Sequence, residues 1–173
     1  IPEGASAADI GGLMEQNGLF TRSEFLAEVN RGNADSPLVQ EIGDWENRAF
    51  LLEGYLFPDT YEFYRDDSPE RVIQKLLDNL EKKITGTQKA RAKEFDMTMD
   101  EVLTLASIIQ AEAGDPAQMK TVSSVLHNRL NSKSHPKLEC DVTIFYLEQE
   151  VQPYLTEDKD RFNSFYNTYK CTG

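Results

Sequence analysis

The chain has 173 residues, of which 39% are hydrophobic and 28% charged, a composition that is ordinary for a soluble globular protein. Its formal net charge is −12, and the negative charge is concentrated in residues 1–70, which hold 15 acidic and 4 basic side chains. Because binding to phosphates needs a basic surface, nucleic acid is not expected as a partner, and an anionic membrane surface is disfavoured for the same reason. No apolar run reaches the roughly 18 residues that a membrane-spanning helix needs.

Two short helices are predicted in residues 5–30. Ile10, Leu13 and Met14 have the spacing of one helix face, and a second helix begins at Ser23. In residues 31–48, Gly, Asn and Pro residues interrupt any regular spacing of apolar side chains, which predicts a loop.

The aromatic-rich segment at residues 51–63 is predicted to be extended. Its dense aromatic side chains favour a strand-like conformation, while Pro58 excludes a central position in a sheet. The pattern predicts minor extended pieces in an otherwise helical protein.

Longer helices are predicted after residue 67. Ser68 and Pro69 have the order of a capping residue followed by a first-turn proline, and an apolar face continues to Ile84. Thr98 and Glu101 have the spacing of a capping box, which opens a helix that Gly114 ends.

Two further helices are predicted beyond Gly114. The next begins at once with Asp115 and Pro116 and extends to Leu130. Asp141 is placed to cap a short helix, after which the tail is polar and aromatic.

Glu112 is the strongest candidate for a catalytic group. It lies at the edge of the apolar stripe of its predicted helix, one turn after Ile109, and in the last turn, where the helix dipole disfavours a carboxylate. Partial burial and the dipole both favour the protonated carboxyl group, which suits a general acid. From the pattern alone, a surface glutamate at a frayed helix end is the commoner interpretation.

The two cysteines, Cys140 and Cys171, do not have the CxxC spacing of a metal site, and the two histidines do not complete a zinc pattern with them. Two interpretations of these residues remain open: two free thiols, or a disulfide between them. A disulfide would need an oxidising compartment. Its loop of about 30 residues would stabilise the fold by roughly 3–4 kcal/mol in the chain-entropy model.

Five segments in order resemble the YceG-like endolytic murein transglycosylases, from residue 1 to the end of the chain. The helix that carries Glu112 resembles the catalytic helix of that family, and the tail matches its YNTY motif. At residues 139 and 140 this chain has Glu and Cys where the family usually has Gln and Ser or Thr. The matching segments read LEGYLFPDTY (52–61), LASIIQAEA (105–113), VLHNRL (125–130), LECDVT (138–143) and YNTY (166–169).

The resemblance implies an α+β, helix-rich fold with a lysozyme-like helical catalytic core and minor extended or β segments. Two parts are expected: residues 1–67 as an N-terminal acidic lobe of the YceG-like domain, and residues 68–173 as the helical catalytic part. The family continues beyond this sequence, so the catalytic part is expected to be truncated at its C-terminus.

The implied activity is that of a lytic transglycosylase that cleaves the MurNAc–GlcNAc β-1,4 bond of nascent peptidoglycan strands and leaves 1,6-anhydroMurNAc ends. Glu112 would be the catalytic acid and base, with no metal and no cofactor. One carboxylate that acts as both acid and base suffices, because the sugar supplies its own nucleophile. Ordinary glycoside hydrolases instead use a pair of carboxylates. The implied substrate-binding residues are Asp141, Thr143, Tyr166, Asn167, Thr168 and Tyr169.

The resemblance also implies partners and a location. The substrate would be peptidoglycan glycan strands, with penicillin-binding proteins of the elongation complex as further partners. A single membrane span outside this chain would hold the catalytic part on the extracytoplasmic side of the cell membrane. Two alternatives stay open: a two-carboxylate glycoside hydrolase that pairs Glu112 with Asp141 or Asp115, and a non-catalytic glycan-binding or scaffold module.

Overall fold

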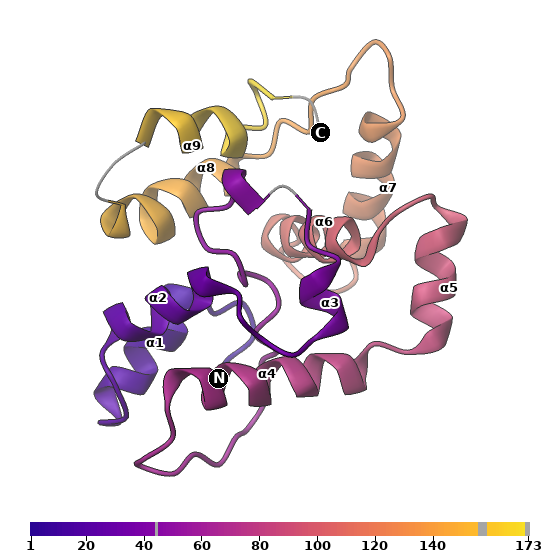
Figure 1. Cartoon of the computed structure of the whole chain (residues 1–173). Helices are drawn as coiled ribbons and strands as arrows, with labels where there is room; N and C mark the ends of the chain where they lie inside the picture. The colour runs from indigo at the N-terminus through magenta and orange to yellow at the C-terminus, as the bar shows by residue number, and fades with distance from the viewer. Residues whose placement is uncertain (44, 156–158, 172–173) are drawn as a thin grey trace. The chain divides into compact units, whose positions relative to one another are not determined.

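The computed structural model describes residues 1–43, 45–155 and 159–171 (Figure 1). These residues form helices joined by turns and loops and contain no strand, so the prediction of a helix-rich fold is confirmed. The chain divides into two compact units, Ile1–Thr104 and Leu105–Gly173. The division predicted between residues 67 and 68 falls inside the first unit, just before its longest helix, and stays a prediction.

The helices of the first unit are α1 (Ala7–Gln16), α2 (Arg22–Arg31), the single-turn α3 (Pro37–Gln40), α4 (Pro69–Lys83) and α5 (Gly86–Glu94), with a 3₁₀ turn at Trp45–Asn47. The helix α6 (Met99–Glu112) begins in the first unit and ends in the second. The second unit continues with α7 (Met119–Leu130), α8 (Asp141–Tyr146), a π-helical turn (Leu147–Val151), a 3₁₀ turn (Gln152–Tyr154) and α9 (Lys159–Tyr166).

The predicted capping residues begin the helices that carry them. Ser68 caps α4, and its side chain accepts a hydrogen bond from the backbone of Arg71. The capping box of α6 is complete: Thr98 Oγ1 accepts the Glu101 N–H at 3.1 Å, and Glu101 Oε2 accepts the Thr98 N–H at 2.7 Å. Each pair satisfies backbone donors that the first helical turn leaves without a partner.

Some elements differ from the prediction. Residues 31–48 contain α3 and a 3₁₀ turn rather than only a loop, because Pro37 stands at the first helical position instead of breaking a helix. The helix α5 was not predicted, although Thr85 and Gln88 form a capping box at its start. It has one buried residue, Ala92, so no apolar face marks it in the sequence.

The prediction of an extended segment at residues 51–63 is also wrong. Residues 51–55 form consecutive turns, in which the Glu53 N–H bonds to Phe50 O at 3.2 Å and the Tyr55 N–H bonds to Leu52 O at 3.1 Å. Residues 57–63 are irregular. Of the aromatic side chains in this segment, Tyr55 is fully buried, whereas Phe57, Tyr61 and Phe63 are half-buried.

The core of the first unit lies where α2 packs on α1 and α4. The inward face of α4 is almost inaccessible to solvent, with Val72, Leu76 and Leu77 fully buried, and Phe25 of α2 is equally buried. In Figure 1, α1 and α2 lie side by side, as their packing requires. Burial of such side chains contributes roughly 1.5–3 kcal/mol each, so this is the main source of stability in the unit.

A partly buried polar cluster holds the beginning of α6. The Tyr55 hydroxyl donates to Asp100 Oδ1 at 2.6 Å, and Arg48 forms an ion pair with the same carboxylate. Burial raises the pKa of Tyr55, and the hydrogen bond to Asp100 raises it further. The turn at residues 51–55 is therefore tied to the N-terminal turn of α6.

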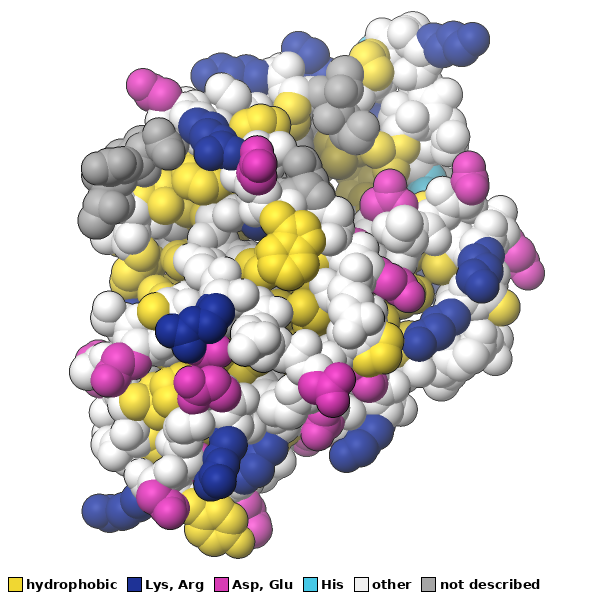
Figure 2. All heavy atoms as spheres, viewed as in Figure 1, with side chains coloured by type: hydrophobic (Ala, Val, Ile, Leu, Met, Phe, Trp, Pro, Cys, Tyr) yellow, Lys and Arg dark blue, Asp and Glu magenta, His cyan; other side chains and the backbone are white. Residues whose placement is uncertain are grey.

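The core of the second unit is smaller. Leu126, Leu138, Leu147 and Val151 are its most buried aliphatic side chains. Other large apolar side chains of this unit are exposed, namely Val125, Leu130, Phe145, Phe165 and Tyr169. On the face drawn in Figure 2, acidic and basic side chains are intermixed around apolar ones.

Candidate functional site

Glu112 is the last residue of α6. Its side chain is exposed, so the prediction of partial burial is wrong. The neighbouring residues of the stripe, Ile109 and Ala113, are only half-buried, because the small core of the second unit does not cover them. The position in the last helical turn is as predicted.

The turn before α8 carries a strained residue. Glu139 has a φ of 53°, a left-handed conformation that residues other than glycine rarely adopt. Arg129 of α7 donates to the Leu138 carbonyl, and its guanidinium lies 3.9 Å from the Glu139 carboxylate. Arg129 belongs to the matching segment VLHNRL, and its role in holding this turn was not predicted.

Thr168 and Thr143 meet at the same turn. The Thr168 side chain is buried, and its Oγ1 accepts the Cys140 N–H at 2.8 Å. The Thr143 hydroxyl donates to the Cys140 carbonyl at 2.9 Å and lies 3.2 Å from Thr168 Oγ1. The structure thus brings together Thr143 and Thr168, which are distant in sequence and were both predicted as site residues.

Asp141 and Tyr169 form the exposed side of this cluster. The Tyr169 hydroxyl donates to Asp141 Oδ1 at 2.9 Å, and this hydrogen bond is the main cause of a raised Tyr169 pKa. Lys137 Nζ donates to the Tyr169 carbonyl at 2.9 Å. Asp141 is the first residue of α8 rather than its cap, which is Cys140.

The two other predicted tail residues face different surroundings. Asn167 Oδ1 accepts the Tyr169 N–H at 3.1 Å, which leaves its amide NH₂ group without a partner among the described residues. The Tyr166 ring stacks on Tyr146 of α8 with centroids 5.7 Å apart, so it joins α9 to α8. Asn167 is therefore available to a ligand, whereas Tyr166 is in part structural.

Cys140 connects this cluster to Glu112. The Cys140 side chain is 4% exposed, and burial raises the pKa of its thiol to about 11, aided by the charge of the Glu112 carboxylate. The nearby Arg129 acts in the opposite direction. This influence of Glu112 on Cys140 was not predicted, and the sequence signals it only through the position of Cys140 beside Asp141.

The two cysteines are free thiols in the structure. Cys140 Sγ lies 3.5 Å from the Leu138 carbonyl, whereas Cys171 Sγ donates to the Phe165 and Asn167 carbonyls at 3.3 Å. The disulfide that the sequence left open is therefore not formed here, and each thiol contacts its own backbone acceptors.

The matching segment at residues 52–61 has structural contacts in the first unit. Both carboxylate oxygens of Glu53 accept the Ala7 N–H at 3.1 Å, which satisfies a donor at the start of α1. Asp59 accepts hydrogen bonds from the Asn79 amide at 3.1 Å and from the Thr60 N–H at 2.8 Å, and these bonds lower the pKa of its carboxyl group. This segment was matched to the family but not assigned to the site.

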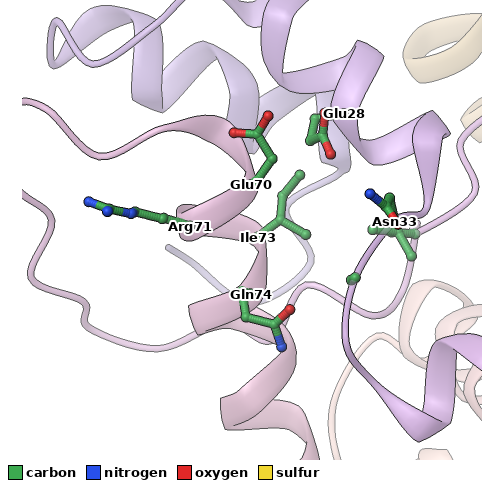
Figure 3. Close-up of a pocket in the computed structure, with 8 residues that line it drawn as sticks. Glu28, Asn33, Glu70, Arg71, Ile73 and Gln74 are labelled. Atoms are coloured by element: carbon green, nitrogen blue, oxygen red, sulfur yellow. The ribbon is translucent and has the colours of Figure 1, made fainter.

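A cavity of about 250 Å³ lies in the first unit (Figure 3). In this view Glu28, Asn33 and Ile73 surround it and the Arg71 side chain extends away. Glu28 is buried but paired with Arg31 at 2.5 Å. Because this carboxylate already has a cation beside it, we interpret the cavity as a structural feature. None of the predicted site residues lines it.

In the part of the chain that the structure describes, no group of three or more His, Cys, Asp or Glu side chains is arranged to hold a metal ion. Among the same residues, no helix combines the length and the apolar character that a membrane span needs.

Comparison with known proteins gives consistent matches over the whole chain. Residues 1–173 match the model of the YceG-like family. The chain is 28% identical over 180 residues to an endolytic murein transglycosylase of Bacillus subtilis (strain 168), covering all of this chain and 49% of the relative. It is 30% identical over 191 residues to an endolytic murein transglycosylase of Streptococcus pneumoniae serotype 2, again covering all of this chain but 34% of the relative.

A solved structure matches as well. The crystal structure of a yceG-like protein from Listeria monocytogenes superposes with a TM-score of 0.72 at 26% sequence identity, covering all of this chain and 59% of that one. This chain therefore spans about half, or less, of the length of the curated relatives that it matches.

Proposed function

Because the chain belongs to the YceG-like family, we propose that its protein is an endolytic peptidoglycan lytic transglycosylase. It would cleave the MurNAc–GlcNAc β-1,4 bond of nascent glycan strands and leave 1,6-anhydroMurNAc ends. The observation that carries the proposal is the match of all 173 residues to the family, with Glu112 at the end of the helix that resembles the family's catalytic helix. The names of the relatives from Bacillus subtilis and Streptococcus pneumoniae support the same activity.

In the proposed reaction Glu112 acts twice. Its carboxyl group first donates a proton to the glycosidic oxygen, so that the bond from this oxygen to C1 of MurNAc breaks. The resulting carboxylate then removes the proton from the C6 hydroxyl of the same sugar, whose oxygen bonds to C1 and closes the anhydro ring. The proton gained in the second step replaces the one given in the first, so no water is consumed. The exposure of Glu112 supports this role, since a polymer has to reach the carboxyl group.

The groups proposed to bind the glycan are those on the exposed side of the cluster. Asp141, Asn167 and Tyr169 present a carboxylate, an amide and an aromatic ring that is 44% exposed. A sugar can place its apolar face on such a ring while its hydroxyl groups bond to the polar atoms. A lysozyme-like arrangement of the helices around Glu112 is part of the same proposal.

Digestion of purified glycan strands by the full-length protein tests the proposal. We expect products with the mass of an anhydro end, and a Glu112→Gln variant that folds and binds strands but loses more than nine-tenths of the turnover rate. Glu148→Gln is the matched control, because Glu148 is an exposed glutamate of the same unit with no side-chain partner in the described structure. A Glu112→Gln variant with a tenth or more of the wild-type rate would contradict the assignment.

The same assay separates the two alternatives. A hydrolase that pairs Glu112 with Asp141 or Asp115 would release products heavier by one water. The Asp115 carboxylate accepts the Ala117 N–H at 2.7 Å and so already stabilises a turn. Binding without turnover by the wild-type protein would favour a glycan-binding or scaffold module.

We further propose that the full-length protein is held at the cell membrane by a single span outside this chain, with the catalytic part on the extracytoplasmic side, where peptidoglycan lies. Penicillin-binding proteins of the elongation complex are proposed partners. Protease treatment of intact spheroplasts tests the location: the catalytic part should be digested while a cytoplasmic marker survives. Protection of the catalytic part would contradict it.

A further inference from the structure

The turn that precedes α8 is held from one side by the tail of the chain. The Glu139 N–H donates to the Thr168 carbonyl at 3.2 Å, and the next N–H, that of Cys140, donates to Thr168 Oγ1 at 2.8 Å. A backbone at a φ of 53° costs free energy for a glutamate, so it persists only where its surroundings fix it. The tail residue Thr168 supplies two of the bonds that fix it.

The Thr168 hydroxyl is already engaged by the turn. Its oxygen accepts the Cys140 N–H, and its hydrogen is directed to the Cys140 carbonyl or to Thr143 Oγ1, each 3.2 Å away. The residue is only 7% exposed. The hydrogen of this hydroxyl is committed to the turn and one lone pair of its oxygen remains, so its bonds favour a role in fixing the turn over the substrate-binding role implied by the family resemblance.

The turn that Thr168 fixes carries the neighbours of Glu112. The Cys140 thiol is near enough to the Glu112 carboxylate to be affected by its charge, and Asp141 follows at once as the first residue of α8. The thiol hydrogen is directed to the Leu138 carbonyl at 3.5 Å, and with a pKa near 11 the thiol is protonated at neutral pH, so it adds no second negative charge beside Glu112. A shift of this turn would therefore change the surroundings of Glu112.

We propose that Thr168 is a positioning residue, whose hydroxyl fixes the turn at Glu139 and Cys140 so that the Cys140 side chain is held beside Glu112. This rests on the proposed function, because it assumes that Glu112 carries the reaction. The hydroxyl acts through the backbone of Cys140 and does not touch the glycan.

Two substitutions in the full-length protein separate the hydroxyl from the shape of the side chain. Thr168→Val keeps the shape and removes the hydroxyl, whereas Thr168→Ser keeps the hydroxyl. We expect kcat to fall about tenfold in Thr168→Val with KM within twofold of wild type, since small misplacements of catalytic groups cost up to about a hundredfold in rate. Thr168→Ser should keep at least half of the wild-type kcat. Thr121→Val is the matched control, because Thr121 is exposed on α7.

Hydrogen exchange gives a second measurement that does not depend on activity. The Cys140 amide should exchange at least tenfold faster in Thr168→Val than in wild type or Thr168→Ser, because its acceptor is gone. If Thr168→Val does not fold, the Ser variant still decides: loss of kcat in folded Thr168→Ser, with the Cys140 amide protected, would overturn the proposal.

The outcomes also distinguish this inference from the proposed function. If Glu112→Gln keeps its rate, the function itself fails. If Glu112→Gln is inactive but Thr168→Val has the wild-type kcat, only the role of Thr168 is wrong. A higher KM with unchanged kcat in Thr168→Val would mean that the hydroxyl binds substrate, which also overturns the proposal.

Discussion

The hydrogen bond between Tyr169 and Asp141 joins two residues that are 28 positions apart in sequence. It uses one oxygen of the Asp141 carboxylate and orients an exposed aromatic ring at the N-terminus of α8. A bond from a phenol to a carboxylate stabilises the protonated phenol, which explains the direction of the Tyr169 pKa. Its strength can be measured directly in solution.

Substitution of Asp141 by Asn should lower the Tyr169 pKa towards the ordinary value of about 10, because the acceptor loses its negative charge. The measurement is an NMR titration of ¹³C-labelled tyrosine. Tyr61 is the internal control: burial raises its pKa, and Asp141 plays no part in that. A Tyr169 pKa that is the same in both proteins would show that the two side chains are not bonded in solution.

At the scale of single residues, the sequence could not predict the contacts that the candidate site residues make. The family resemblance singled out Thr143 and Thr168, but their hydroxyl groups bond to the Cys140 backbone, which only coordinates reveal. The predicted burial of Glu112 is wrong. An apolar stripe on a helix indicates which face turns inward, but it does not indicate how many other side chains pack against that face.

Among the elements, α4 depends on an ordered turn before its cap. Asp67 Oδ2 accepts the Tyr64 N–H at 2.9 Å and the Lys75 ammonium at 3.1 Å. These contacts, the backbone bond first, lower the pKa of Asp67 below its ordinary value. The carboxylate therefore links the turn to the helix that supplies the inward face of the first unit.

This linkage predicts a dependence of stability on pH. Because the folded-state pKa lies below the unfolded value of about 3.9, the contribution of Asp67 is complete above that value and is lost as the pH falls through the folded-state pKa. In urea unfolding between pH 5 and pH 2, the midpoint of wild type should fall more steeply than that of Asp67→Asn. Asp66→Asn is the control, since Asp66 is exposed and no described residue pairs with it. Equal slopes for wild type and Asp67→Asn would contradict the prediction.

The helices that the sequence predicted are those in which a capping residue precedes an apolar face, as at Ser68 and Thr98. The helix α5 has a capping residue but no apolar face. Residues 51–63 are rich in aromatic side chains but have no partner strand among the described residues. Local propensity could not resolve either case, because tertiary packing decides both.

At the scale of the whole molecule, the two units differ in how much apolar surface they bury. The inward residues of α4 are 0–4% exposed, whereas α7 has one buried residue, Leu126. Local opening requires less free energy where few apolar contacts are broken. The second unit, which carries Glu112, is therefore expected to open more readily.

Hydrogen exchange followed by mass spectrometry checks this expectation. Amides of α7 and α8 should have protection factors at least tenfold lower than those of α4, once intrinsic rates are removed. The α1–α2 pair, which also contributes to the core of the first unit, should behave as α4 does. Equal protection in α4 and α7 would show that the small core is as stable as the large one.

The helix α6 belongs to both units, since it begins at Met99 and ends at Glu112 while the units divide at Thr104. A cut at that division would separate the capping box at Thr98 and the bonds of Asp100 from Glu112, and each severed half-helix is too short to form by itself in water. Recombination between homologues faces the same constraint. A crossover that preserves α6 has to fall in the loop before Thr98 or after Glu112, so the polar cluster that starts the helix and the carboxyl group that ends it are inherited together.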